Sequence, residues 1–255
     1  MTINEIDYYF KVREDKDVAL NLGVIYKNLG YSKIDKTKIS KIYDITSEDI
    51  NSEYYLNNLT IKAKSANERE RDKLNNICEQ LKCKWEAYKG EYFDIISKVF
   101  GIEFDYSATN YTYCYLQLLP IDELDLVDHI IYLDANRSVE DIFKTFIIML
   151  TKALLLDRWN YVNNWEYNCE FEGKNKIWIF VEIAIDAIFN NSDLIKISNE
   201  PSYKYFYDFK VKEEKLMYKF RDAYKTTLLD EFFTSVYMFV HENYQTLLHF
   251  KNYLY

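Results

Sequence analysis

Residues 146–156 read FIIMLTKALLL, and residues 177–190 read IWIFVEIAIDAIFN. Wound as a helix, each stretch is apolar on nearly every side. A helix without a polar face has to be covered by other elements all round. The two stretches therefore predict two helices in the middle of a domain.

Charged side chains interrupt these helices at three positions. Lys152 lies in the first helix, while Glu182 and Asp186 lie four residues apart in the second, and hence on one face. Burying a charge is costly unless the charge is paired or hydrogen-bonded. The simplest solution is that these groups meet.

A small sheet is predicted just before the first helix. Residues 109–119, TNYTYCYLQLL, are β-branched and aromatic and favour a strand, which Pro120 ends. Residues 130–133 favour a second short strand. Ser138 to Asp141 then have the spacing of a capping box at the start of the first apolar helix.

Helices are expected over most of the remaining chain. Ser65 to Glu68 also has capping-box spacing and predicts the start of a helix that runs to about Phe100, where Gly101 ends it. The remaining expectations are helices and turns over 1–60, a polar loop over 158–175, and amphipathic helices over 213–224 and 228–250. The fold class is therefore α+β, mostly helical, with a small sheet around residues 109–134. We expect a helical N-terminal region over 1–100 and an α+β core with C-terminal helices over 101–255, joined in one compact unit.

Composition restricts the possible functions. Hydrophobic residues make up 49% of the chain, and only 5 Gly and 2 Pro occur, which favours long helices over a many-turned β-sandwich. The net charge of -9 argues against nucleic acid as a general partner, and it permits an acidic face directed at a basic protein. The 25 Tyr fit the codon bias of an AT-rich genome, with a tyrosine-rich binding surface as the alternative.

The sequence also speaks to location and cofactors. No run of about 18 apolar residues occurs, and residues 2–16 are polar and charged, so we expect a cytoplasmic protein without a membrane span. The four Cys are sparse for a disulfide framework, and no two of the three His stand at ligand spacing. No cofactor is therefore expected.

The two apolar helices resemble the core of gluzincin zinc peptidases. In that family a strand at the edge of the cleft precedes a buried helix with His-Glu-x-x-His, and a second helix carries Glu-x-x-x-Asp. Here the strand would be residues 130–133, and Glu182 to Asp186 matches the second motif as it stands. The likeness covers residues 109 to about 190.

The resemblance implies a zincin-like fold with a degenerate site. It places Ile148 at the first zinc-ligating histidine, Met149 at the catalytic glutamate and Lys152 at the second histidine. Glu182 would be the remaining ligand of the zinc, and Asp186 the residue that orients a ligand histidine. Under this alignment no metal is bound, and the Lys152 ammonium stands within about 4 Å of Glu182, the usual limit of an ion pair.

Alternative interpretations stay open at this stage. Lys152 and Glu182 could be an ordinary core ion pair in an unrelated helical protein. The first function hypothesis is a pseudo-metallopeptidase that works by binding another protein along its sheet. The others are an acidic inhibitor or immunity-type protein, and an enzyme that uses a non-metal site with Glu182 and Asp186 as acid and base.

Overall fold

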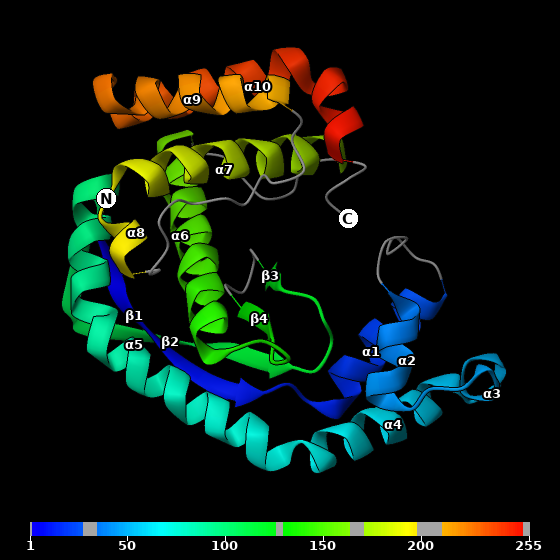
Figure 1. Ribbon diagram of the computed structural model, residues 1–255. Coiled ribbons are helices and arrows are strands. Elements are labelled where there is room, and N and C mark those ends of the chain that lie inside the picture. Colours follow the sequence, from blue (N-terminus) through cyan, green and yellow to red (C-terminus); the bar gives the residue numbers. More distant parts are fainter. Residues whose placement is uncertain (1, 28–34, 126–129, 164–170, 198–210, 252–255) are drawn as a thin grey trace. The chain divides into compact units, whose positions relative to one another are not determined.

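A computed structural model describes residues 2–27, 35–125, 130–163, 171–197 and 211–251 (Figure 1). The chain divides into two compact units whose segments alternate along the sequence. The helical unit comprises Met1–Glu5, Ala87–Asn110 and Ile147–Leu254. The sheet unit comprises Ile6–Glu86, Tyr111–Phe146 and Tyr255. The two units are defined by contacts between residues and do not test a domain boundary. The expected boundary near residue 100 therefore stays a prediction.

The predicted fold class is confirmed: helices dominate, and the described residues form one small mixed sheet. Its strands lie in the order β1-β2-β4-β3. Their bounds are β1 Thr2–Val12, β2 Glu103–Gln117, β3 Glu123–Asp125 and β4 Ile130–Asp134. In the register of the sheet, β2 pairs parallel with β4 at Tyr115 and Tyr132, and β3 pairs antiparallel with β4 at Glu123 and Tyr132.

Two expectations about the sheet were wrong. Residues 2–12 form a strand where helices and turns were expected, because β2, almost a hundred residues later, supplies the neighbour beside which β1 lies. Residues 130–133 do form a strand, but β3 covers its outer side, so β3 and not β4 ends the sheet order.

One face of the sheet is packed into an aromatic core. Tyr8 of β1 is 4% exposed, and its ring meets those of Trp85 and Phe146 edge-on at centroid distances of 6.1 and 5.0 Å. Phe146 also contacts Phe10 and Phe143, at 5.1 and 6.1 Å. Phe146 is thus the centre of a ring cluster that joins β1 to α5 (Arg71–Phe100) and to the start of α6 (Val139–Asn163).

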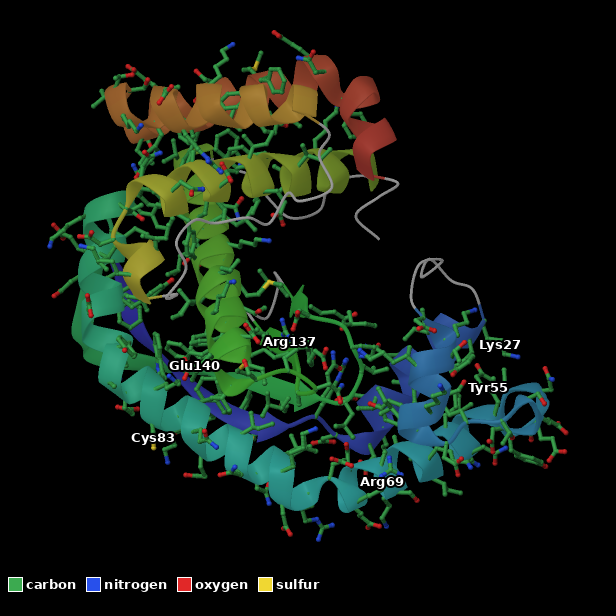
Figure 2. The ribbon with its side chains drawn as sticks, viewed as in Figure 1. Lys27, Tyr55, Arg69, Cys83, Arg137 and Glu140 are labelled. Atoms are coloured by element: carbon green, nitrogen blue, oxygen red, sulfur yellow. The ribbon has the colours of Figure 1, made fainter. Side chains whose placement is uncertain are left out.

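Shorter helices complete the sheet unit. They are α1 (Asp15–Tyr26), α2 (Lys36–Tyr43), α3 (Ser47–Asn51) and α4 (Tyr55–Arg69). Asp35 caps α2, and Thr46 forms a capping box at α3. Lys27 at the end of α1 lies over the Tyr55 ring of α4, with the ammonium 4.8 Å from its centroid (Figure 2).

The predicted helix start at Ser65 was also wrong. Ser65 lies inside α4, because a buried stripe at helical spacing, formed by Leu59, Ala63 and Ala66, runs past it. The chain leaves the helix at Glu70 and re-enters it as α5. Capping-box residues thus occur within a helix when an apolar stripe continues through them.

The helical unit is built around the second apolar stretch, α7 (Phe171–Asn191). Helices α9 (Val211–Thr226) and α10 (Leu229–Lys251) pack against α7, and α8 (Leu194–Ile197) follows it (Figure 1).

Ser138 caps α6 as predicted, accepting from the Asp141 N–H at 3.1 Å. The expected loop over 158–175 is partly helical, since α6 runs to Asn163 and α7 begins at Phe171; residues 164–170 lie outside the described part. None of the described helices is long and apolar enough to cross a membrane.

Substitution of Phe146 by alanine should strongly destabilise the fold, because it leaves a cavity at the centre of the ring cluster. We expect Phe146→Ala to lower the free energy of unfolding by about 3–5 kcal/mol. Leu20→Ala is the control, because Leu20 is 55% exposed on α1; its effect should stay within about 0.5 kcal/mol. Chemical denaturation followed by circular dichroism measures both, and equal effects would contradict the assignment of Phe146 to the core.

Candidate functional site

The ion pair expected from the sequence is present. The Lys152 ammonium of α6 donates a hydrogen bond to Oε1 of Glu182 on α7. Lys152 is 2% exposed, and the Glu182 side chain is 15% exposed. Water therefore screens this pair little, and the ion pair compensates charge that burial would otherwise make costly.

Asp186, one turn further along α7, has a cation of its own. The Arg221 guanidinium of α9 binds the Asp186 carboxylate at two points, with Nε–Oδ2 2.6 Å and Nη2–Oδ1 2.7 Å. Asp186 is 2% exposed, and burial raises the pKa of its carboxyl while the hydrogen bond and charge of Arg221 act in the opposite direction. Asn190 Nδ2 adds a 3.3 Å contact to the same carboxylate.

Arg221 is the residue of this site that sequence reasoning missed. It lies on an amphipathic helix rich in charges, where one arginine looks like any other surface residue. The indication of a second cation lies in the sequence of α7. Two carboxylates in an apolar helix need two cations, and Lys152 supplies one. The second carboxylate therefore predicts a second cation on another helix.

The other two positions of the degenerate site belong to the core. Ile148 is 1% exposed and Met149 is 6% exposed within α6. Beside them, the Thr151 hydroxyl donates to the Ile147 carbonyl at 2.7 Å and lies 3.1 Å from the Tyr92 hydroxyl. Both side chains are apolar, so neither supplies a zinc ligand or a general base.

These residues do not fit a zinc ion. Structural and catalytic zinc sites draw on histidine, cysteinate and carboxylate side chains, at least three in the usual case. Within the described ranges, no three such side chains come together. Among the five predicted positions, Glu182 and Asp186 carry carboxylates, and these are bound by Lys152 and Arg221.

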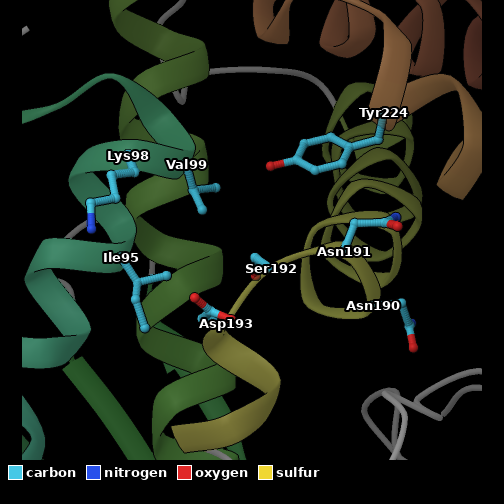
Figure 3. Close-up of a pocket in the computed structure, with 8 residues that line it drawn as sticks. All are labelled: Ile95, Lys98, Val99, Asn190, Asn191, Ser192, Asp193 and Tyr224. Atoms are coloured by element: carbon cyan, nitrogen blue, oxygen red, sulfur yellow. The ribbon is translucent and has the colours of Figure 1, made fainter.

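A pocket of about 540 Å³ opens further along the same helices (Figure 3). Its lining comes from the ends of α5 and α7, the turn after α7, and α9, and includes Lys98, Asn191, Ser192, Asp193 and Tyr224. The Tyr224 ring reaches from α9 toward α5, and burial raises the pKa of its hydroxyl. The polar lining suits a small polar molecule, and neither Lys152 nor Glu182 takes part in it.

A second polar cluster lies in the sheet unit, where β2 and β4 end. Arg13 is 7% exposed, donates to Gln117 Oε1 at 2.6 Å and lies 3.5 Å from Glu123. Next to it, Arg137 (Figure 2) pairs with Asp122 and donates to Thr145 at 2.9 Å. Each charge in this cluster has an opposite charge beside it, and the cluster fixes the strand ends.

Comparison of the chain with protein-family models, with curated proteins and with solved structures finds no match.

Removing one partner of the buried pair should cost far more than removing both. Glu182→Ala removes the carboxylate that accepts from the buried Lys152 ammonium, and we expect a loss of roughly 3–5 kcal/mol in the free energy of unfolding. The double variant Lys152→Met with Glu182→Leu should cost much less, because no charge remains buried.

The control is an exposed pair of the same unit, Asp222 and Lys225, whose charged atoms lie 3.1 Å apart. Asp222→Ala should change the stability by less than about 1 kcal/mol. Urea unfolding of the variants measures all three values. A double variant as unstable as Glu182→Ala would show that packing, and not charge compensation, holds the two helices together.

Proposed function

We propose that this chain is a non-catalytic, gluzincin-like protein that acts by binding another protein. The supporting observation is the Lys152–Glu182 ion pair. It joins the helix that aligns with His-Glu-x-x-His to the helix that carries Glu-x-x-x-Asp. The lysine side chain stands where that alignment puts the second histidine, so an ammonium takes the role of the cation.

The same geometry disfavours the enzyme hypothesis with Glu182 and Asp186 as acid and base. General acid–base catalysis needs a carboxyl group within hydrogen-bond reach of a substrate. Glu182 is held by Lys152, and Asp186 is bound by both ends of the Arg221 guanidinium and is 2% exposed. Both carboxylates are thus engaged within the protein.

An extended partner segment beside the terminal strand β3 is the binding mode that we propose. Peptides add to a sheet through main-chain hydrogen bonds with its outermost strand. β3 ends the sheet order, and the side chains of Glu123, Leu124 and Asp125 are all half-buried. We place this binding in the cytoplasm, where thiols such as those of Cys78, Cys83 and Cys114, which are free, persist.

The net charge of -9 favours a related candidate, an acidic inhibitor or immunity-type protein. Such a protein would cover a basic surface of its target, and the affinity would then fall steeply with ionic strength. Affinity measured between low and high salt separates the two cases. A complex held mainly by main-chain pairing along β3 should lose little affinity over that range.

Reversal of charge on β3 should weaken partner binding without unfolding the protein. Asp125→Lys changes the terminal strand, and Asp94→Lys, at an exposed position of α5, is the matched control. Each variant would be used to capture proteins from the native host, with quantification by mass spectrometry. We expect a specific partner to be depleted by Asp125→Lys and not by Asp94→Lys. Equal capture by both variants would move the interface away from the sheet edge.

The alignment with the family can be tested by rebuilding its ligand set. Ile148→His, Met149→Glu and Lys152→His together would place two imidazoles four residues apart near Glu182, as the family motif requires. The folded variant should bind a stoichiometric zinc ion, measured by elemental analysis after dialysis. Adding Glu182→Gln is the control and should weaken zinc binding. A folded triple variant that binds no zinc would contradict the alignment.

A further inference from the structure

Tyrosine rings form a continuous row across three strands of the sheet unit. The row consists of Tyr9 on β1, Tyr113 and Tyr115 on β2, and Tyr132 on β4. Successive ring centroids are 6.1 Å apart from Tyr9 to Tyr113, 5.7 Å from Tyr113 to Tyr115, and 5.7 Å from Tyr115 to Tyr132. The last two rings are stacked, with an angle of 18° between their planes.

This tyrosine row lies on the sheet face opposite the aromatic core. Side chains alternate along a strand, so Cys114 and Leu116 point into the core while Tyr113 and Tyr115 point away from it. Both core-facing residues are 0% exposed, whereas Tyr113 is 38% and Tyr9 is 48% exposed. Tyr115 and Tyr132 are half-buried, so the row is exposed at Tyr9 and Tyr113 and partly covered along the rest. Aromatic surface that stays accessible to solvent in this way marks an interaction site in many soluble proteins.

The rings of the row already bind cations from their own chain. The Lys11 ammonium is 4.2 Å from the Tyr113 ring centroid, and the Arg13 guanidinium is 3.9 Å from that of Tyr132. A cation within about 6 Å of a ring centroid is attracted by the π-electrons of that ring. The face is therefore chemically suited to ammonium and guanidinium groups.

Carboxylates flank the tyrosine row. Glu123 pairs with Tyr132 in the register of β3 and β4, and Asp125 pairs with Ile130, two residues along, so both carboxylates lie on the face of the row. Burial raises the pKa of Tyr132; Arg13 opposes that rise, and the charges of Asp125, Asp17 and Glu123 add to it. Glu14 and Asp17 act in the same direction on Tyr115. Four carboxylates thus act on the row, against the two cations already on it.

We propose that the tyrosine row binds an extended peptide segment of a partner protein through arginine or lysine side chains. This inference rests on the proposed protein-binding function and names the face and the chemistry of the partner. Cationic side chains would stack on the rings while the Asp125 carboxylate of β3 contributes to compensating their charge, since Glu123 already pairs with Arg13. In an extended segment, alternate side chains on one face are about 6.7 Å apart. That spacing is close to the ring spacing, so basic residues at every second position match the row.

The same surface argues against single-stranded nucleic acid. Tyrosine platforms do stack bases, but binding of the backbone needs a positively charged groove. Here four carboxylates would repel phosphates, and the whole chain carries a net charge of -9. Tight binding of single-stranded nucleic acid would therefore contradict the proposal, and the experiment includes it as a probe.

The experiment uses the full chain and three fluorescein-labelled probes, with binding measured by fluorescence anisotropy at low and moderate salt. The probes are a ten-residue peptide of alternating arginine and serine, its glutamate–serine counterpart, and a ten-nucleotide oligothymidine. We expect the arginine peptide to bind at least tenfold more tightly than the other two. Tyr115→Ala should weaken that binding roughly 2- to 30-fold, the range for one cation–π contact, and Tyr115→Phe should retain most of it. Tyr161→Ala is the control, since Tyr161 is 64% exposed on α6, and should have no effect.

Two results would overturn the assignment of this face. One is an arginine peptide that binds no better than the glutamate peptide, or that is insensitive to Tyr115→Ala. The other is oligothymidine as the tightest probe, which would assign the row to nucleic acid. The arginine peptide could fail to bind while Asp125→Lys still depletes a captured partner. That pair of results would support the protein-binding function and contradict only the assignment of the tyrosine row as the binding face. If Asp125→Lys has no effect while the arginine peptide binds and Tyr115→Ala weakens that binding, neither the edge-strand mode nor the compensating role of Asp125 holds, and the tyrosine rings alone carry the binding.

Discussion

Compensation of buried charge is the constraint on which the helical unit depends. Between Ile177 and Phe189, helix α7 is apolar except for two carboxylates. Glu182 accepts from the Lys152 ammonium, and Asp186 accepts from the Arg221 guanidinium. The cations come from two different helices, α6 and α9. A shift of either helix by one turn would leave a charge buried without its partner, at a cost of several kcal/mol. The apolar surfaces drive these helices together, and the two ion pairs select their register.

The sequence was informative where one residue's environment could be deduced from its own neighbours. The apolar runs predicted α6 and α7, and Lys152 in such a run required a buried partner, which Glu182 proved to be. Prediction failed where the decisive contact came from a distant segment. Residues 2–12 become a strand only because β2 lies beside them, and Arg221 gains its role only because α9 lies along α7. The prediction of a helix start at Ser65 failed for a different reason. A capping pattern is present there, but the buried apolar stripe of α4 continues through it.

The same limit applies to predicting function, as the tyrosine row shows. In the sequence the 25 tyrosines fit codon bias as well as a binding surface. Alternation within each short strand puts tyrosine on one face, but only the order of the strands brings Tyr9, Tyr113 and Tyr132 into one row. In the proposals made above, the helices that resemble a metal site serve as a scaffold, and recognition lies on the sheet. The ion pair and the row belong to different compact units.

The Lys152–Glu182 pair also has an evolutionary consequence. Any mutational path toward a metal-binding site would have to replace Lys152, and the first such step leaves the Glu182 carboxylate without its ammonium. An imidazole or carboxylate at Ile148 or Met149, introduced first, would instead enter a packed core without a hydrogen-bonding partner. Every single step is disfavoured, although the endpoint reached by all steps together need not be. Substitution one residue at a time would therefore pass through variants with an unpaired charge or a buried polar group, so the ion pair sets a stability barrier between this chain and a metal-binding variant.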